Sequence, residues 1–343
     1  MLASIIIGNY NYGRFVGEAI ESALSQSRAN LEVIVVDDGS TDQSRDVIES
    51  FEDKIRSIFT EHRGQCACLN TGFAASLGDV ILFLDADDCL TGEAISNLVQ
   101  PLLDDSGVVQ SQGYLDVVDE KRKSLGRTIP RKLSPSGDYR ERTLTRGPGA
   151  CQQPYTSGNL WRRRLLEAVF PLPETLSVQR DGYLGPDGYL NSVARLFGRL
   201  ASVHSVVAQY RIHGRNNWHG ATQFSAEALS SHLAKISYHI DYLSHWSTKL
   251  GYVPHDDRWR KWKRNWADNL AVFALSLMDP SASRPQFHEM VFSPFMSGTT
   301  HRVKALGLTL VLTAIWCAPE SLALRSSKRL LAHKLPHLSV GRV

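Results

Sequence analysis

Residues 80–88 read Val-Ile-Leu-Phe-Leu-Asp-Ala-Asp-Asp, an apolar run that ends in three acids. The run follows Gly78 and begins with β-branched residues, which is typical of a strand buried on both faces of a parallel sheet. Asp85, Asp87 and Asp88 therefore stand at the carboxyl end of this strand. Open α/β sheets bind ligands at that end, so the stretch predicts both a fold and a place for a site.

Three crowded carboxylates repel one another, and a divalent cation would compensate them. Hard oxygen ligands suit Mg²⁺ or Mn²⁺, which in turn hold phosphate oxygens. The alternative is a strand end followed by an Asx turn and the start of a helix. The stretch alone leaves both interpretations open.

Composition limits the class of protein. The chain has 343 residues, 43% hydrophobic and 21% charged, which indicates a globular protein of one large or two smaller domains. The net charge of +3 gives no reason to expect nucleic acid as a partner. Cys66 and Cys68 are too close for an ordinary disulfide framework, which favours a reducing, cytoplasmic location. We expect neither a signal peptide at Met1 nor a membrane span, because no apolar run reaches about 20 residues.

Apolar strands alternate with helical spacing through the first hundred residues. We expect strands at 3–7, 31–36, 55–59 and 80–84, and helices at 15–24, 40–51, 64–75 and 92–103. Ser40 and Gln43 read as a capping box for the second helix. This βαβ series predicts an α/β fold with a mostly parallel sheet flanked by helices.

Two further strand ends should share the edge of Asp85. Backbone groups at Gly8 and Asn9 follow the first strand and can approach a planar base closely. Asp37 and Asp38 end the second strand, where a carboxylate can accept a hydrogen bond from a base or a ribose. The chain has no Gly-x-Gly-x-x-Gly and no Walker lysine motif, which argues against ordinary dinucleotide and P-loop sites.

Four segments in order carry a resemblance: 4–11 (Ser-Ile-Ile-Ile-Gly-Asn-Tyr-Asn), 35–42 (Val-Val-Asp-Asp-Gly-Ser-Thr-Asp), 64–72 (Gly-Gln to Asn-Thr-Gly) and 83–88 (Phe-Leu-Asp-Ala-Asp-Asp). Together they resemble the family 2 glycosyltransferases, which have a GT-A, Rossmann-type fold. The likeness is strong over the first 100 residues and weaker to about Asn217. It implies an inverting transfer of a sugar from a nucleotide-sugar, with a divalent metal, Mn²⁺ or Mg²⁺.

The resemblance also assigns roles to residues. It implies donor-binding residues at the strand ends and beside them: Gly8, Asn9, Tyr10, Asp37, Asn70 and Asp85. Asp85 and Asp87, in an Asp-x-Asp spacing, look like the acids of the metal and the diphosphate. One departure is that many members have Arg before the Asn of the third segment, where this chain has Leu69.

The middle of the chain holds less specific signals. We expect one or two strands over 108–118, and the basic stretch 120–146 is either a mobile loop or hairpin on the acceptor side or a solvated insertion. Tyr155 to Asn159 is similar to the family's Ser-Gly segment. Trp161 after it lies either near a ligand or in the core.

Asp187 stands at the start of an apolar helix that ends near Gly198. The family has an acidic residue at the start of the corresponding helix. The resemblance implies that Asp187 is the general base, which takes the proton of the acceptor hydroxyl. Asp181 competes for this role, and a helix cap is the structural alternative for Asp187.

The segment Tyr-Arg-Ile-His at 210–213 resembles a further family segment. It implies that His213 completes the metal shell or donates to the diphosphate, although a lone His is usually structural. Arg211 or Arg215 would neutralise the leaving group, where charge develops.

After Asn217 the chain changes character, with helices expected over 225–250, 256–277 and 304–317. Trp259, Trp262 and Trp266 share helical spacing with basic residues between them, which suits either an anionic membrane surface or packing on the protein itself. The apolar segment 305–318 is too short to span a membrane and should be buried or lie in an interface.

The sequence therefore predicts a GT-A-like catalytic domain over 1–217 and a helical region over 218–343. We expect an inverting transferase of nucleoside-diphosphate sugars, with uridine as the favoured base and a glycan or lipid-linked acceptor. It would be cytoplasmic, with peripheral membrane contact through its C-terminal helices. The alternatives are a nucleotidyltransferase acting on sugar phosphates, which would release pyrophosphate, and a non-catalytic membrane-associated scaffold.

Overall fold

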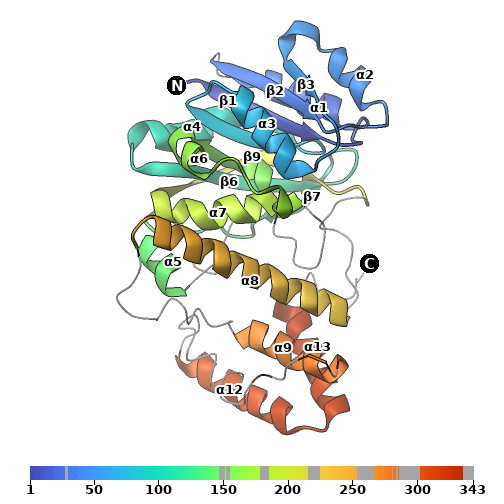
Figure 1. Cartoon of the computed structure of the whole chain (residues 1–343), viewed down its shortest axis with the longest axis vertical. Helices are drawn as coiled ribbons and strands as arrows, with labels where there is room; N and C mark the ends of the chain where they lie inside the picture. Colours follow the sequence, from blue (N-terminus) through green and yellow to red (C-terminus); the bar gives the residue numbers. More distant parts are fainter. Residues whose placement is uncertain are drawn as a thin grey trace. The chain divides into compact units, whose positions relative to one another are not determined.

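The computed structural model describes residues 1–27, 30–146, 151, 155–177, 185–214, 225–252, 266–279, 281–282, 285 and 302–334. The chain folds into two compact units (Figure 1). The first runs from Met1 to His213 apart from the short segments 144–148 and 179–184, and the second contains those segments and everything from Gly214 onward. Asn217, the predicted boundary, lies outside the described residues, so that boundary stays a prediction.

The first unit contains one sheet with the strand order β3-β2-β1-β4-β8-β6-β9-β5, and β7 pairs with β6. The strands are β1 (Ala3–Asn9), β2 (Leu31–Asp37), β3 (Arg56–Phe59), β4 (Val80–Asp85), β5 (Cys89–Leu90), β6 (Val108–Val118), β7 (Ser124–Ile129), β8 (Asn159–Arg162) and β9 (Arg199–Arg211). Strands β3, β2, β1 and β4 are parallel to one another. Strand β8 is antiparallel to both of its neighbours, β4 and β6, and strands β6 and β9 are parallel to each other. The predicted, mostly parallel sheet is confirmed.

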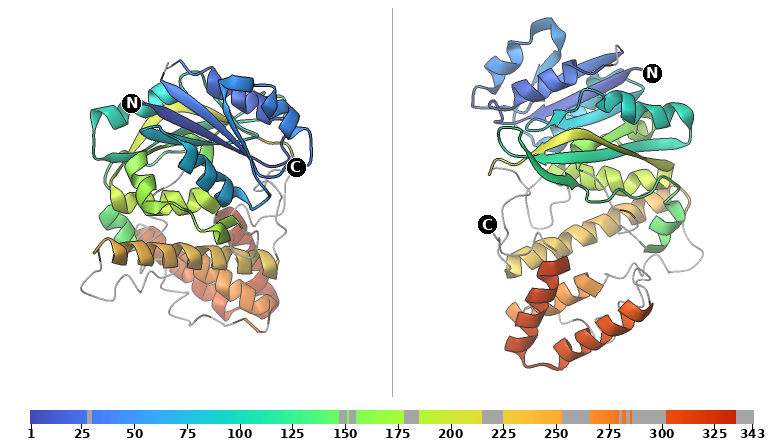
Figure 2. Two further views of the ribbon diagram at one scale, coloured as in Figure 1. Left: turned by 45° about the horizontal axis from the view of Figure 1, so that its top comes forward. Right: turned by 180° about the vertical axis from the view of Figure 1, so that it is seen from behind.

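Helices cover both faces of this sheet (Figures 1 and 2). The helices of the unit are α1 (Val16–Leu24), α2 (Ser44–Glu49), α3 (Gln65–Ala75), α4 (Ala94–Asp104), α5 (Arg140–Arg146), α6 (Arg163–Val169) and α7 (Gly185–Phe197). Alternate residues of β1 explain the two layers. Ile5 and Ile7 pack in a core with α1 and α4, whereas a Cβ at Gly72 of α3 would overlap Ile6 on the opposite face. Strands buried on both faces are therefore apolar nearly throughout.

The register brings the predicted strand ends to one edge. Gly8 pairs with Asp85, and Asn9 pairs with Asp37. The prediction that the ends of β1, β2 and β4 share an edge is confirmed.

One local prediction needs correction. Gln43, not Ser40, precedes α2, and neither residue forms the capping box. Ser40 instead donates its hydroxyl to the Asp37 carboxylate at 2.6 Å. Before α2, Asp42 accepts the Ser44 N–H at 2.9 Å. In the stretch 120–146, the predicted hairpin is present, since β7 pairs with β6, and the stretch also contains α5.

The second unit is helical, as expected, with α8 (Ala226–Lys249), α9 (Trp266–Met278), α12 (Arg302–Cys317) and α13 (Glu320–Lys334). Ser225 caps α8 by accepting the Ala228 N–H at 3.1 Å. Leu270 and Phe273 of α9 are fully buried in a core shared with the other helices. The described part of the predicted aromatic helix thus packs on its own unit, while Trp259 and Trp262 lie outside the described residues.

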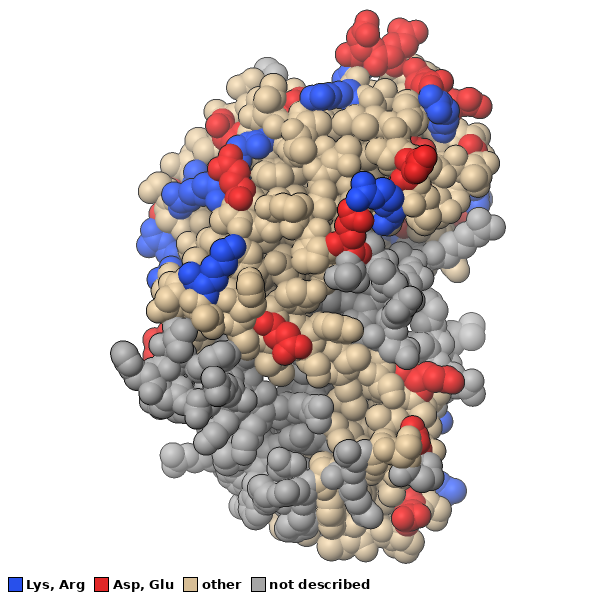
Figure 3. Space-filling view, viewed as in Figure 1, with Lys and Arg blue, Asp and Glu red and all other residues tan. Residues whose placement is uncertain are grey.

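Two surface properties complete the description. On the face drawn in Figure 3, the Lys and Arg side chains of the described residues are interspersed with Asp and Glu. Among the described helices, none combines the length and the apolar character that a membrane crossing requires.

Candidate functional site

Asp85 ends β4 at the shared edge of the sheet. Loss of solvent around its carboxyl, together with the nearby charges of Asp87 and Asp187, raises its pKa to about 8. Burial and like charges both disfavour the ionised form. Asp85, Asp87 and Asp187, the last from a distant part of the chain, are therefore close enough to interact electrostatically.

Asp87 faces the end of β9. Its Oδ2 lies 2.9 Å from Nε2 of His213, whose side chain is only 2% exposed. The rings of Tyr12 and Phe15 enclose this imidazole, with centroid distances of 5.6 and 4.7 Å. His213 is therefore held against Asp87 by both a polar contact and aromatic packing.

Asp88 lies beneath the site. It is 1% exposed, and burial and the charges of Asp87 and Asp85 raise its pKa well above the usual range. Ser157 donates to Asp88 Oδ2 at 2.7 Å, and the Arg211 N–H donates to Oδ1 at 3.1 Å. The Asp85 N–H in turn donates to Ser157 Oγ at 3.2 Å, so Asp88 fixes the turn that carries the other two acids.

Asp187 is the third residue of α7, which begins at Gly185, so it does not occupy the N-cap position. Its charge raises the pKa of Asp85 and, after burial, that of Tyr155. The carboxylate therefore faces the edge where β4 ends. Asp181, the competing candidate for the base, lies outside the described residues.

The acid cluster fits a divalent cation through its donor chemistry. Within the described part of the chain, no three His, Cys, Asp or Glu side chains form a complete metal-binding group, so the predicted shell of Asp85, Asp87 and His213 is not assembled. Mg²⁺-type sites commonly use one or two carboxylates and complete their shell with water and substrate phosphates. Asp85 and Asp87 match such a partial site, because a cation between them would relieve the repulsion that raises the pKa of Asp85.

An aromatic pair lies beyond the end of β1. The rings of Tyr10 and His62 are stacked, with centroids 3.9 Å apart and an interplanar angle of 17°. His62 Nδ1 lies 2.9 Å from Asp38 Oδ2, and the N–H groups of Arg63 and Gly64 also donate to that carboxylate at 2.8 and 2.7 Å. Tyr10 is 40% exposed, so a flat aromatic surface is open to a ligand.

Asp37 is buried and already hydrogen bonded. Its Oδ1 accepts from Asn9 Nδ2 at 2.7 Å and from the Ser40 hydroxyl, and its Oδ2 accepts the Ser40 N–H at 3.0 Å. Asn9 Oδ1 is buried and has no hydrogen-bond partner among the described residues. Asn9 and Asp37, both predicted to contact the nucleotide-sugar, are thus hydrogen bonded to each other. The Asn9 Oδ1 atom is the acceptor of this pair that has no partner among the described residues.

Three predicted donor contacts have other roles in the structure. A Cβ at Gly8 would meet Cys68 Sγ at 3.1 Å, so this glycine permits close packing of α3. Asn70 donates to the Leu172 carbonyl at 2.9 Å and accepts its N–H at 2.7 Å. Both ends of that amide are therefore committed to the backbone, and a donor contact by Asn70 gains no support.

Arg211 is the third such residue, since it is 2% exposed and faces the interior. Its guanidinium binds Glu18 Oε2 at 3.0 Å and donates to the carbonyls of Asp87 and Glu120 at 2.9 and 3.0 Å. It therefore braces the acid turn and the β6–β7 turn, and its predicted contact with the leaving group stays a prediction. Arg215, the alternative, lies outside the described residues.

Comparison with known proteins agrees with this geometry. Residues 4–170 match the family described as Glycosyl transferase family 2. An uncharacterized glycosyltransferase of Nostoc sp. (strain PCC 7120) is 35% identical over 256 residues, which cover 74% of this chain and 77% of that relative. The chain belongs to glycosyl transferase family 2. Within this family, the putative glycosyltransferase EpsH of Bacillus subtilis is 26% identical and covers 61% of this chain and 60% of its own.

Solved structures show the same GT-A-like fold. S. aureus TarS 1–349 in complex with UDP-GlcNAc aligns with a TM-score of 0.53 at 15% identity, over 92% of this chain and 91% of that one. The mannosyltransferase PcManGT from Pyrobaculum calidifontis, in complex with GDP-Man and Mn²⁺, aligns with a TM-score of 0.50 at 16% identity, over 98% of this chain and 86% of that one. At such low identities, the two solved structures show a likeness of fold alone.

Sequence reasoning missed several residues of the site. His62 gave no signal, because its contact with Tyr10 depends on the course of the loop after β3. Asp88 and Ser157 were visible in their motifs, but their contact joins residues 69 positions apart. Leu69, where many members have Arg, is 3% exposed and belongs to the core.

Proposed function

We propose that this family 2 member transfers a sugar from a nucleoside-diphosphate sugar to an acceptor hydroxyl, with inversion at the anomeric carbon. The observation that carries the proposal is that the charge of Asp187 raises the pKa of Asp85, which supports Asp187 as a base acting near the candidate diphosphate acids. The bound UDP-GlcNAc and GDP-Man of the two structural relatives support a nucleotide-sugar as donor. We favour UDP-sugars.

The nucleoside would bind at the ends of β1 and β2. Tyr10 offers its exposed ring to the base, supported from behind by His62. Asn9 Oδ1 is a free acceptor for a base or ribose donor once it becomes accessible. Asp37 orients that amide by accepting its Nδ2–H.

In the transfer, the acceptor oxygen attacks the anomeric carbon as the bond from that carbon to the diphosphate oxygen breaks. The Asp187 carboxylate takes the proton of the acceptor hydroxyl, and the nucleoside diphosphate leaves with the electron pair of the broken bond. A divalent cation held by Asp85 and Asp87 would neutralise charge on the leaving diphosphate. His213 would keep the Asp87 carboxylate oriented for this task.

The test uses the purified full-length protein with UDP- and GDP-sugars and Mn²⁺, and measures the nucleoside product. We expect release of a nucleoside diphosphate from one donor, and a loss of about 10²-fold or more in Asp187→Asn. Asp138→Asn, an exposed acid outside the site, is the matched control.

Other outcomes would contradict the proposal in different ways. Release of pyrophosphate would indicate a nucleotidyltransferase instead. Metal-independent nucleotide binding with no turnover would indicate a scaffold that kept the fold. Full activity in Asp187→Asn would remove this residue from the mechanism. We place the acceptor among cell-surface glycans or lipid-linked glycans, as part of the same proposal.

A further inference from the structure

The outer face of α12 is unusual for a surface helix. No charged residue occurs between Lys304 and Glu320. Leu310 is 65% exposed and Val311 47% exposed. Ala314 and Cys317 are exposed as well and follow at helical spacing, so the apolar residues form one continuous stripe. A helix that packs only against its own unit places polar residues on such a face.

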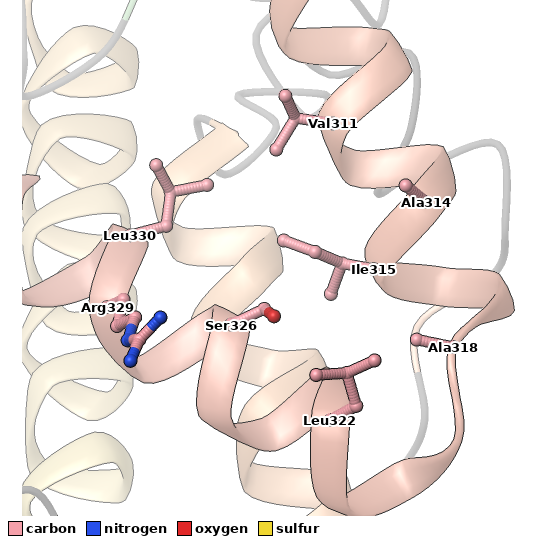
Figure 4. A pocket seen from close by; sticks show the side chains of 8 residues that line it. All are labelled: Val311, Ala314, Ile315, Ala318, Leu322, Ser326, Arg329 and Leu330. Carbon is pink, nitrogen blue, oxygen red and sulfur yellow. The ribbon is translucent and has the colours of Figure 1, made fainter.

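The stripe continues onto α13 across a shallow groove. Leu322 of α13 is 52% exposed. The groove between the two helices has a volume of ≈ 510 Å³, and its walls are mainly apolar. Figure 4 shows that side chains of α12, such as Val311 and Ile315, and of α13, such as Leu322 and Leu330, turn toward this common space.

The rim of this apolar surface carries mainly basic side chains. Arg325, Lys328 and Arg329 of α13 are exposed, and Arg329 also lines the groove (Figure 4). Between 302 and 334 the sequence has six Lys and Arg residues and one acid, Glu320. An exposed apolar patch bordered by basic side chains matches the chemistry of an anionic lipid surface.

We infer that the α12–α13 face docks on an anionic lipid bilayer, with the apolar stripe in the interface and the basic residues of α13 near lipid phosphates. Pairing of this face with a second copy would bring the basic rims together, and within 302–334 each copy has only Glu320 as an acid against six Lys and Arg residues. An excess of like charges across an interface is unfavourable. The proposed docking face differs from the Trp-bearing helix predicted from the sequence, because the residues from Leu270 to Leu275 of α9 are buried. It does not depend on the proposed sugar transfer.

The experiment is co-sedimentation of the full-length protein with vesicles. Vesicles of phosphatidylcholine alone are compared with vesicles that contain about 30% phosphatidylglycerol. We expect binding to be about ten-fold tighter or more with the anionic lipid and to weaken as salt rises. The double variant Leu310→Ser, Val311→Ser should lose about ten-fold or more, since two apolar side chains no longer enter the interface.

Two further variants separate apolar and electrostatic contributions. Arg325→Gln with Lys328→Gln should weaken binding to anionic vesicles several-fold and flatten its salt dependence. Leu77→Ser, at a 76% exposed leucine of the first unit, is the matched control and should bind as the wild type. Circular dichroism and nucleotide-dependent thermal shift, unchanged in all variants, show that the fold and the nucleotide site are intact.

Three results would overturn the inference. The first is equal binding to neutral and anionic vesicles. The second is vesicle binding by the Leu310→Ser, Val311→Ser variant at the wild-type level. The third is a concentration-dependent dimer in sedimentation equilibrium that the same variant dissociates, which would assign this face to a second copy. A failure of donor turnover would contradict the proposed function and leave vesicle binding unaffected.

Discussion

His213 Nε2 and Asp87 Oδ2 lie 2.9 Å apart and join the end of β9 to the acid turn after β4. The two residues are 126 positions apart in the chain. Both side chains are largely buried, with 2% and 14% exposed. A carboxylate held in this way has a fixed orientation before any ligand binds, which is the usual function of a partner behind a metal-binding acid.

His213→Phe tests this role. The substitution keeps an aromatic ring between Tyr12 and Phe15 but removes the polar contact with Asp87. We expect the variant to fold, and its Mn²⁺-dependent affinity for UDP, measured by calorimetry, to fall by about ten-fold. His204→Phe, at an exposed histidine of β9, is the control and should bind as the wild type. Equal affinity in both variants would show that His213 does not orient Asp87.

Asp85 makes the metal-free protein sensitive to pH. Its pKa is about 8 in the folded chain, against about 3.9 for an unperturbed Asp. The folded state therefore binds more protons than the unfolded state between these values, and stability decreases as pH rises from about 4 to 8. In EDTA at pH 8, we expect Asp85→Asn to unfold about 2 °C or more above the wild type.

The metal should reverse that order. With Mn²⁺ and UDP present, the wild type gains stability from binding, whereas Asp85→Asn has lost a carboxylate ligand and gains less. Differential scanning fluorimetry at pH 5 and pH 8, with and without Mn²⁺, measures all four states. A variant that is less stable than the wild type in EDTA at pH 8 would contradict the electrostatic explanation.

Glu18 and the buried Arg211 form the brace under the site. Glu18→Gln leaves the guanidinium with a weaker partner at the 3.0 Å contact. Glu18 is 40% exposed, so solvent screens part of the loss, and we expect a destabilisation of about 1–2 kcal/mol in urea unfolding. Glu49→Gln breaks the exposed pair with Arg45 and should cost less than about 0.5 kcal/mol. Equal costs for the two variants would show that burial of Arg211 adds nothing.

Local patterns were sufficient for the frame of the site. Apolar runs ending in acids located β2 and β4, and the rule that parallel strands end at one edge brought Asp37 and Asp85 together. The place of Asp187 came from the family resemblance, and the structure puts its charge beside Asp85.

The orientation of individual side chains was beyond the sequence. Arg211 and His213 alternate with Ile212 and so point to the same side, yet Arg211 is paired with Glu18 in the interior and His213 contacts the acid turn. The orientation of Arg211 depends on its ion pair with Glu18 of α1, a helix almost two hundred positions earlier in the chain. For the same reason, the hydrogen bond of Asn70 to the Leu172 carbonyl could not be predicted from the sequence, and a donor contact by Asn70 stays a prediction.

Tyr10 and His62 give the last prediction. Stacking of a base on an aromatic ring contributes about 1–3 kcal/mol, so Tyr10→Ala should weaken UDP binding by about ten-fold or more. His62 stacks on one face of that ring with the centroids 3.9 Å apart, and His62→Ala should weaken binding by a smaller factor of about 2–5. Tyr238→Ala, at an exposed tyrosine of α8, is the control for calorimetry. Tighter binding in His62→Ala would mean that the base takes the place of the imidazole, and that His62 opposes binding rather than supporting it.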